Sequence, residues 1–250
     1  MMRAVQRILS VFESFTTGKT SLTLHEISNR IDLPKSTAFR IVQSLERAGY
    51  LVRLENQQYC LSFRFTRLAG LVGSTLGIRE VARPVMTELA KLTQETVSLQ
   101  MAKGDERVCI DAVATASALR SVSQPGEHVP LMDGASSKAL LAYLTKQEAR
   151  PMVARIAKTH KRTQAEIQAE FATIRANGYA VSHGERVLGV SAIAAPIVGA
   201  DDQVHYCVSL AGPTVRVRSQ QSKFVKLVLT AAADISSRYG GAVDNPQLRS

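Results

Sequence analysis

Apolar residues recur at spacings of three and four between residues 36 and 47, a pattern that predicts an amphipathic helix. The apolar stripe consists of Ala38, Ile41, Val42 and Leu45. Pro34 disfavours helical backbone at Leu33, and the Ser36 hydroxyl can cap the amides that follow. We therefore expect the helix to begin near Ser36 and to end before Gly49, whose lack of a Cβ suits a helix C-terminus.

The opposite face of this helix is polar and carries no carboxylate. Its side chains are those of Thr37, Arg40, Ser44 and Arg47. A shorter helical pattern containing Ile27 and Ile31 precedes it, separated by a turn around Asp32. Two short apolar runs after Gly49 flank residues 55–57 and predict a hairpin, or wing. A small helical domain with solvated polar faces is the alternative, but turn, cap, acid-free face and wing follow the order of a winged helix-turn-helix, which binds the DNA major groove.

Six residues are candidate DNA contacts: Lys35, Ser36, Thr37, Arg40, Ser44 and Arg53. Arg40 is the foremost, because a guanidinium there can bind guanine O6 and N7 or a phosphate, with a solvated helix arginine as the alternative. Ser36 and Thr37 can contact phosphates or base edges, although Ser36 can also serve only as a cap. Lys35 and Arg53 are candidates for phosphate contact. Phe39 lies between the two faces, where packing is favoured over contact with a thymine methyl group.

Helical patterns also flank this region. An apolar face within residues 1–16 consists of Val5, Ile8, Leu9 and Phe12, and it should pack under the helix-turn-helix. Arg3 and Arg7 lie on its polar side, where they touch phosphate or are solvated. Residues 62–77 regain helical spacing and then contain three glycines, which predicts a linker helix between domains.

Residues 78–250 combine strand and helix patterns. Strands are predicted at 96–102, 107–113, 119–123, 189–196 and 204–210, and helices at 78–92, 136–143, 166–176 and 222–239. A polar tail after residue 239 is expected to be disordered. The order of these elements predicts an α+β domain of the kind that senses small molecules.

Length and charge fit two domains and a polyanionic partner. A chain of 250 residues can form one large or two modest domains, and two agrees better with the patterns. The net charge is +10, and residues 1–77 hold ten Lys/Arg against five Asp/Glu, so positive charge is densest there. Charge alone does not separate DNA from RNA or an anionic membrane. No segment approaches the roughly 18 apolar residues that span a bilayer, and the N-terminus does not resemble a signal peptide. We expect a soluble, cytoplasmic protein that does not bind membranes.

The sequence gives little support for catalysis or metal binding. Cys60, Cys109 and Cys207 stand far apart, so structural zinc and a disulfide framework are not expected, and each should be a small buried apolar residue. There is no nucleophile paired with a base and a third orienting group, no metal-ligand spacing and no phosphate-binding loop. We expect no catalytic residue, no metal and no cofactor.

A series of short motifs runs in order through both halves of the chain. They are residues 33–37 (LPKST) with Arg40 and Leu45, 49–51 (GYL), 95–99 (ETVSL), 138–142 (KALLA), 174–180 (IRANGYA), Glu185 with 189–190 (GV), 193–196 (IAAP) and 209–213 (SLAGP). In this order and spacing, the chain resembles the IclR family of bacterial transcriptional regulators over nearly its whole length. The resemblance implies a winged helix-turn-helix domain in residues 1–61, a linker helix in 62–77 and a GAF-like α/β effector-binding domain in 78–250. It also implies a dimer, or a dimer of dimers, that binds double-stranded operator DNA and responds to a small metabolite, often a carboxylate or aromatic acid.

The resemblance further implies a ligand pocket. The positions that match those of family members binding small organic acids are Val129, Ala135, Ser136, Ser182, Ala192, Ser209 and Ala211. The chain departs from the commoner family pattern at Ser137, Ser182, Ala192 and Ala211, where Gly, Asp, Cys and Ser respectively are frequent. The loss of polar contacts disfavours a two- or three-carbon ketoacid and favours a larger, more apolar ligand. An aromatic acid is the preferred class.

Other interpretations of the C-terminal region remain open. The helix start at residues 135–137 offers amides and two hydroxyls to a carboxylate, with ordinary capping as the alternative. Arg120 or His128 can add a charge or simply lie on the surface, and His183 is a weaker candidate for ligand or metal contact. The alternatives to a ligand-responsive regulator of a catabolic pathway are an enzyme acting on a small carboxylate and a DNA-binding protein without an effector. The lack of a catalytic grouping favours the regulator.

Overall fold

The computed structural model describes residues 3–16, 18–68, 77–115 and 123–241. The chain divides into two compact units, an N-terminal unit of Met1–Gly77 and a C-terminal unit of Ile78–Ser250. Each unit has an apolar core of its own.

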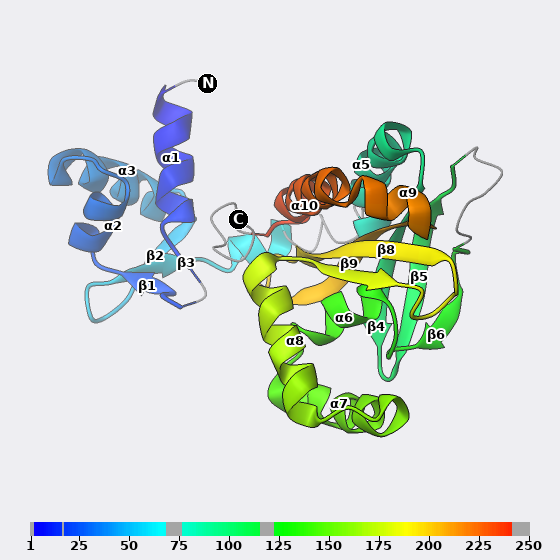
Figure 1. The fold of residues 1–250 in the computed structure, drawn as a ribbon. Helices are drawn as coiled ribbons and strands as arrows, with labels where there is room; N and C mark the ends of the chain where they lie inside the picture. Colours follow the sequence, from blue (N-terminus) through cyan, green and yellow to red (C-terminus); the bar gives the residue numbers. More distant parts are fainter. Residues whose placement is uncertain (1–2, 17, 69–76, 116–122, 242–250) are drawn as a thin grey trace. The chain divides into compact units, whose positions relative to one another are not determined.

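The N-terminal unit is a winged helix-turn-helix. Its elements are α1 (Arg3–Glu13), β1 (Ser21–Leu22), α2 (Leu24–Arg30), α3 (Lys35–Arg47), β2 (Leu51–Arg53) and β3 (Tyr59–Leu61). The strands pair antiparallel in the order β1-β3-β2, and the wing turn joins β2 to β3 (Figure 1). A short turn separates α2 from α3, so the predicted helix-turn-helix and wing are confirmed.

The second helix of the motif, α3, begins without a side-chain cap. Pro34 occupies the N-cap position, and its carbonyl accepts hydrogen bonds from the amides of Thr37 and Ala38 at 2.8 and 3.0 Å. Ser36 is already inside the first turn and exposed, so the prediction that it caps the helix is wrong. After the helix, Gly49 has a φ of 77°, a conformation that glycine adopts without strain. The predicted helix end is confirmed.

The apolar face of α1 is only partly covered. The core of the N-terminal unit consists of Val11, Leu22, Ile27, Val42, Leu45, Leu51 and Tyr59. Within α1, Val11 is fully buried, whereas Val5, Ile8 and Leu9 are 43, 36 and 42 % exposed. The prediction that the whole face packs under the helix-turn-helix is therefore wrong for the first half of α1. Periodicity identifies an apolar face, but it does not identify what the face contacts.

The predicted linker helix is described only over its first part. Residues 64–68 are helical, and they pack on the N-terminal unit. The ring of Phe65 lies 5.0 Å from that of Phe12 and 5.8 Å from that of Tyr50, measured between centroids. The Arg64 guanidinium lies 5.5 Å from the Tyr50 ring centroid. Residues 69–76 lie outside the described part of the chain.

The C-terminal unit is an α+β domain built on one antiparallel sheet in the order β6-β5-β4-β9-β8-β7. The strands are β4 (Thr96–Lys103), β5 (Glu106–Val113), β6 (His128–Pro130), β7 (Ala180–His183), β8 (Val190–Val198) and β9 (Val204–Pro213). The helices are α5 (Ile78–Thr93), α6 (Ala135–Leu141), α7 (Lys146–His160), α8 (Gln164–Asn177), α9 (Thr214–Ser219) and α10 (Gln221–Arg238). Helices α5 and α10 cover one face of the sheet, and α6 and α8 lie on the other (Figure 1). Residues on both faces of the central strands are therefore shielded from solvent.

Four elements of this unit, α7, α9, β6 and β7, were not predicted from the pattern. Helix α7 starts with a capping box between Thr145 and Glu148 and buries Ala149, Val153 and Ile156. A proline lies inside it, a feature that typically interrupts helices. The strand predicted at 119–123 and the polar tail fall largely or wholly outside the described residues.

The three cysteines are free thiols in different surroundings. Cys109 and Cys207 are buried as predicted, whereas the prediction is wrong for Cys60, which is only half-buried because the neighbouring Tyr59 takes the core side of β3. Burial raises the pKa of the Cys109 thiol to about 11 and that of the Cys207 thiol to about 12. Both therefore remain protonated and unreactive at neutral pH.

A buried ion pair joins the start of the central strand β4 to α9. The Glu95 side chain is 1 % exposed and accepts hydrogen bonds from Nε and Nη2 of Arg216 at 2.6 and 2.9 Å. The Glu95 carboxylate lies directly against the backbone of Gly212 in β9, where a Cβ would overlap it. Glycine at this position is what allows the carboxylate to approach the strand.

We expect Gly212→Ala to lower the free energy of unfolding by about 1 to 3 kcal/mol, because the added methyl group must displace a buried, paired carboxylate. Chemical denaturation of the full chain measures the change. Gly18→Ala is the matched control, since a Cβ there meets no atom within 4 Å, and it should change stability by less than about 0.5 kcal/mol. Equal stability of the two variants would contradict the importance of this close contact.

Candidate functional site

The predicted DNA contacts of α3 lie on its solvent-facing surface. Lys35, Ser36, Arg40 and Ser44 are exposed, and Thr37 is half-buried. Lys35 and Arg40 form no ion pair with other residues in the described part of the chain, so their charges are uncompensated. The Ser44 hydroxyl donates to the Arg40 carbonyl at 2.8 Å, which leaves it mainly as a hydrogen-bond acceptor. The face is therefore positively charged, and its cations are available to a polyanion.

A groove runs between this face and α1. It has a volume of about 330 Å³ and is lined by Ala4, Arg7, Ile8, Thr37, Arg40, Ile41, Ser44 and Leu45. Arg7 and Arg40 thus bring guanidinium groups from two helices to one surface. This placement favours phosphate contact over simple solvation for Arg7.

The wing supplies a further cation. Arg53 is exposed in β2; its guanidinium donates to the side-chain oxygen of Gln57 and lies 5.9 Å from the Tyr59 ring centroid. These contacts hold the Arg53 side chain at the wing. Phe39 is 43 % exposed, so the interpretation of Phe39 as a packing residue is wrong: Ala38 and Val42 fill the core side of α3 and leave Phe39 facing solvent.

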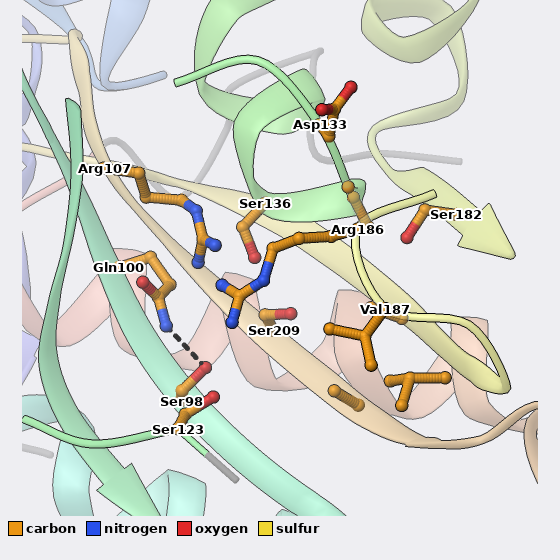
Figure 2. Close-up of a pocket in the computed structure, with 15 residues that line it drawn as sticks. Ser98, Gln100, Arg107, Ser123, Asp133, Ser136, Ser182, Arg186, Val187 and Ser209 are labelled. Carbon is orange, nitrogen blue, oxygen red and sulfur yellow. Dashed lines mark hydrogen bonds between the residues drawn. The ribbon is translucent and has the colours of Figure 1, made fainter. Parts of the chain in front are cut away.

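The C-terminal unit contains a cavity of about 290 Å³ beside the first turn of α6 (Figure 2). It is lined by Ser98, Gln100, Arg107, Ser123, Asp133, Gly134, Ala135, Ser136, Ser182, Arg186, Val187, Val190, Ala192, Ser209 and Ala211. Five strands, three loop segments and the start of α6 contribute residues, so the cavity exists only in the folded domain. Its walls carry serine hydroxyls, two guanidinium groups and small aliphatic side chains.

Strand register places the residues of the cavity floor. Ser98 of β4 pairs with Ser209 of β9, and Ala192 of β8 pairs with both Ala211 of β9 and Ser182 of β7. Cross-strand partners project to the same side of a sheet, and so do residues two apart along one strand. The sheet therefore gathers on one face residues that are far apart in the sequence.

Six of the seven predicted ligand residues line this one cavity: Ala135, Ser136, Ser182, Ala192, Ser209 and Ala211. Val129 is not among the residues that line this cavity, so the structure does not bring it together with the other six, and its role as an apolar wall stays a prediction. It lies in β6, the edge strand, paired with Arg107 of β5, and thus one strand beyond the residue that reaches the cavity. Ser136 and Ser137 do not cap α6, because Gly134 occupies the N-cap position and both serines are already inside the helix.

Arg107 is the principal cavity residue that sequence reasoning missed. It is 7 % exposed, yet its guanidinium extends into the cavity (Figure 2). Its Nε is buried without a hydrogen-bond partner, and the guanidinium forms no ion pair with residues that the structure describes. Burial lowers the pKa of Arg107, and the nearby charge of Arg186 lowers it further. The group remains a cation at neutral pH and has unused donors that face an empty volume.

Two further ionic groups border the cavity. Arg186, in the loop between β7 and β8, donates from Nη2 to Glu127 at 3.2 Å, and its side chain is 37 % exposed. Figure 2 shows the Arg186 and Arg107 guanidinium groups extending toward each other from different elements. Asp133 also lines the cavity, but its carboxylate pairs with Nε2 of His160 on α7 at 2.7 Å. The cavity is therefore suited to anions.

The other candidate charges are placed elsewhere. His128 is exposed in β6 and contacts Glu106 through Nδ1 at 2.8 Å, and Arg120 lies outside the described residues. His183 contacts the Ser191 hydroxyl at 2.8 Å and thus has a structural partner. In the described ranges, no group of His, Cys, Asp and Glu side chains is arranged to hold a metal ion.

Comparison with known proteins places both units in one family. A family model for the "IclR helix-turn-helix domain" matches residues 4–55, and a model for the "Bacterial transcriptional regulator IclR C-terminal" matches residues 71–237. The chain belongs to the IclR family of bacterial transcriptional regulators. It is therefore a regulator with a DNA-binding helix-turn-helix and not an enzyme.

IclR-family relatives match along most of their length. The transcriptional regulator KipR of Bacillus subtilis is 31 % identical over 229 residues, covering 89 % of this chain and 91 % of that protein. The regulator SauR of Cupriavidus necator is 31 % identical, covering 92 % of this chain and 94 % of SauR. The crystal structure of an IclR regulator from Silicibacter sp. TM1040 has a TM-score of 0.88 at 27 % identity and covers all of both chains. Among the helices of the described residues, none combines the length and hydropathy needed to cross a membrane.

Proposed function

We propose that this IclR-family regulator controls a catabolic pathway and that a small organic acid, bound in the C-terminal cavity, changes its affinity for operator DNA. The observation that carries this proposal is Arg107, a nearly buried guanidinium without a partner among the described residues, facing a cavity of about 290 Å³. A buried cation without a counter-charge is unfavourable. A carboxylate supplies that charge and matches the planar fork of the guanidinium.

The two regions of the chain take separate roles in this proposal. We assign DNA binding to residues 1–61, coupling to residues 62–77 and effector binding to residues 78–250. Arg40 contacts bases, and the remaining contacts to the operator come from Lys35, Ser36, Thr37, Ser44 and Arg53. Arg107 joins the six predicted cavity residues in binding the effector.

The proposed active form is a dimer, or a dimer of dimers, acting on DNA in the cytoplasm. Two winged domains then bind two half-sites of the operator, and their spacing decides the fit. The effector shifts the balance between two arrangements only by binding one more tightly than the other.

An aromatic acid remains the sequence-based prediction for the effector class. The apolar side of the cavity is formed by Ala135, Val187, Val190, Ala192 and Ala211, which can contact a ring or an aliphatic chain. No aromatic side chain is present among the described residues that line the cavity, so a ring would pack against aliphatic groups without stacking. The five lining serines and Gln100 provide hydrogen bonds to the polar part of the ligand.

A thermal-shift panel of aliphatic and aromatic carboxylates on the full-length protein tests this function. A ligand that binds the folded state raises the melting temperature by mass action. Each acid that does so is then added to the protein bound to a DNA site selected from a random library, with fluorescence anisotropy as the measurement. We expect an acid that raises the melting temperature also to change DNA affinity. If no acid in the panel raises the melting temperature or changes the affinity for DNA, the result favours a regulator without an effector.

A further inference from the structure

We infer that the effector of this regulator is a dianion, a compact dicarboxylate with one carboxylate on Arg107 and the other on Arg186. The inference rests on the proposed function, because it describes the ligand of the same cavity. It goes beyond a monocarboxylate or aromatic acid by requiring a second anionic group. The argument depends on the charges that face the cavity and on their partners.

The first anchor is Arg107, which is positioned by the middle of the sheet. It lies in β5 opposite Ala102 of β4, and Gln100 of β4 lines the cavity beside it. The Gln100 amide is already engaged, since Nε2 donates to the Ser98 hydroxyl at 2.8 Å (Figure 2). Neighbouring polar groups therefore do not satisfy the Arg107 Nε, which is buried without a partner. An anionic group of the ligand can pair with the part of the Arg107 guanidinium that faces the cavity.

The second anchor is Arg186, which comes from the loop between β7 and β8. Two guanidinium groups directed at the same volume repel each other unless negative charge lies between them. Arg186 is paired on one side with Glu127 at 3.2 Å, a carboxylate whose side chain is 33 % exposed. The Arg186 group is thus held at the cavity by a partly solvated contact, which leaves guanidinium donors available on the cavity side.

The charge balance of the cavity favours two negative charges over one. The lining contains two cations, Arg107 and Arg186, and one carboxylate, Asp133. Asp133 is committed to His160 of α7 at 2.7 Å and is not between the guanidinium groups (Figure 2). A monoanion on Arg107 leaves Arg186 with only its partly solvated contact to Glu127 at 3.2 Å. A dianion pairs with Arg107 and also with the cavity side of Arg186.

The remaining lining determines the rest of the ligand. Hydroxyl groups of Ser98, Ser123, Ser136, Ser182 and Ser209 surround the cavity, and the aliphatic side chains lie mainly on β8, β9 and the 184–189 loop. The volume of about 290 Å³ limits the ligand to a short chain or a single ring. Two planar guanidinium forks from separate elements suit two separate planar carboxylates better than one tetrahedral phosphate.

Isothermal titration calorimetry of the full-length protein with matched acids tests the inference. The probes are succinate, glutarate, adipate and phthalate, each compared with its half-amide, which has the same shape and one carboxylate fewer. We expect at least one dicarboxylate to bind roughly 10- to 100-fold more tightly than its half-amide, the usual effect of one charge-assisted contact. Whether the preferred probe is aliphatic or phthalate identifies the scaffold between the carboxylates.

Two variants assign the second carboxylate to Arg186. Arg186→Gln should weaken binding of the dicarboxylate far more than binding of the half-amide and so remove the preference for the dicarboxylate. Glu127→Gln should have the opposite effect and tighten dicarboxylate binding, because it removes the carboxylate that competes for Arg186. The two variants are expected to change dicarboxylate affinity in opposite directions. A folding defect would weaken binding in either variant and so could not produce both results. Arg150→Gln, an exposed arginine on α7, is the control and should preserve the preference.

The possible results separate this inference from the proposed function. Equal binding of dicarboxylates and half-amides overturns the dianion and leaves a small organic acid effector intact. Binding of no acid in the panel, with or without two carboxylates, contradicts both. Preferential binding of inorganic phosphate that Arg186→Gln abolishes overturns the dicarboxylate. A preference that survives Arg186→Gln overturns the assignment of the second anchor.

Discussion

Replacement of Arg107 by glutamine is expected to abolish the thermal response to carboxylates and to raise the melting temperature of the ligand-free protein. The ligand effect follows because Arg107 offers the buried, unpartnered guanidinium of the cavity. The stability effect follows because a cation that is 7 % exposed and lacks a partner is unfavourable in the empty protein. A gain of about 1 kcal/mol corresponds to an increase of roughly 2 to 4 °C for a chain of this size.

Differential scanning fluorimetry with and without the acids from the panel measures both effects of Arg107→Gln. Arg107→Lys is a useful intermediate, since it keeps the charge but loses the planar fork, and it should retain only part of the ligand response. Arg150→Gln is the matched control and should leave both melting temperatures unchanged. A lower melting temperature for ligand-free Arg107→Gln would show that Arg107 supports the fold, and the assignment to ligand binding would then be withdrawn.

Arg107 could not be identified from the local pattern of β5. By the alternation of a strand, Arg107 and Cys109 point to one side, and the apolar Val108 and Ile110 point to the other. This is also the pattern of a solvent-exposed arginine near the end of a strand. Its burial results from α6 and the 184–189 loop, which come together over the sheet only in the folded domain (Figure 2). Contacts of that kind leave no periodic signal in the sequence.

A weaker signal for the cavity was present in β4. Ser98 and Gln100 are 4 and 2 % exposed despite being polar, because helices cover both faces of the sheet. Polar residues at every second position would normally indicate a solvent-facing side. The pattern of Ser98 and Gln100 predicts a polar cavity only when both faces of the sheet are known to be covered. Ser182, Ser209 and the other predicted ligand positions were found through the family resemblance. Matching its motifs along the whole chain locates pocket residues from distant segments, which local periodicity does not.

The winged helix-turn-helix was predictable because its determinants are local. Pro34 fixes the start of α3, and Gly49 with its φ of 77° ends the segment. The buried positions Ala38, Val42 and Leu45 follow the helical period. The same reasoning failed for α1, where Val5 and Leu9 have the correct spacing but no covering element within the described N-terminal unit. Local patterns thus determine secondary structure more reliably than they determine packing partners.

Arg40→Ala is expected to weaken operator binding by roughly 1 to 3 kcal/mol, about 5- to 150-fold in Kd, and to relax sequence preference at one position of each half-site. Arg40 is exposed on α3 and unpaired among the described residues, and it shares a groove with Arg7. Its removal therefore breaks no ion pair or side-chain hydrogen bond among the described residues and should leave the melting temperature nearly unchanged. Fluorescence anisotropy with the selected operator and with single-base variants of it measures both the affinity and the preference.

Lys35→Ala distinguishes base recognition by Arg40 from general attraction to the DNA backbone. Lys35 is also exposed and unpaired among the described residues, but it is a point charge at the start of α3. A lost phosphate contact should weaken all DNA sequences alike and reduce the slope of log K against log salt by about 1. Arg40→Ala, by contrast, should change the ranking of sequences. If Arg40→Ala instead weakens binding to all DNA sequences alike and lowers the salt slope, Arg40 contacts phosphate. Base recognition must then come from other residues of α3. If Arg40→Ala also lowers affinity for the effector, Arg40 has a structural role that its exposed position does not predict.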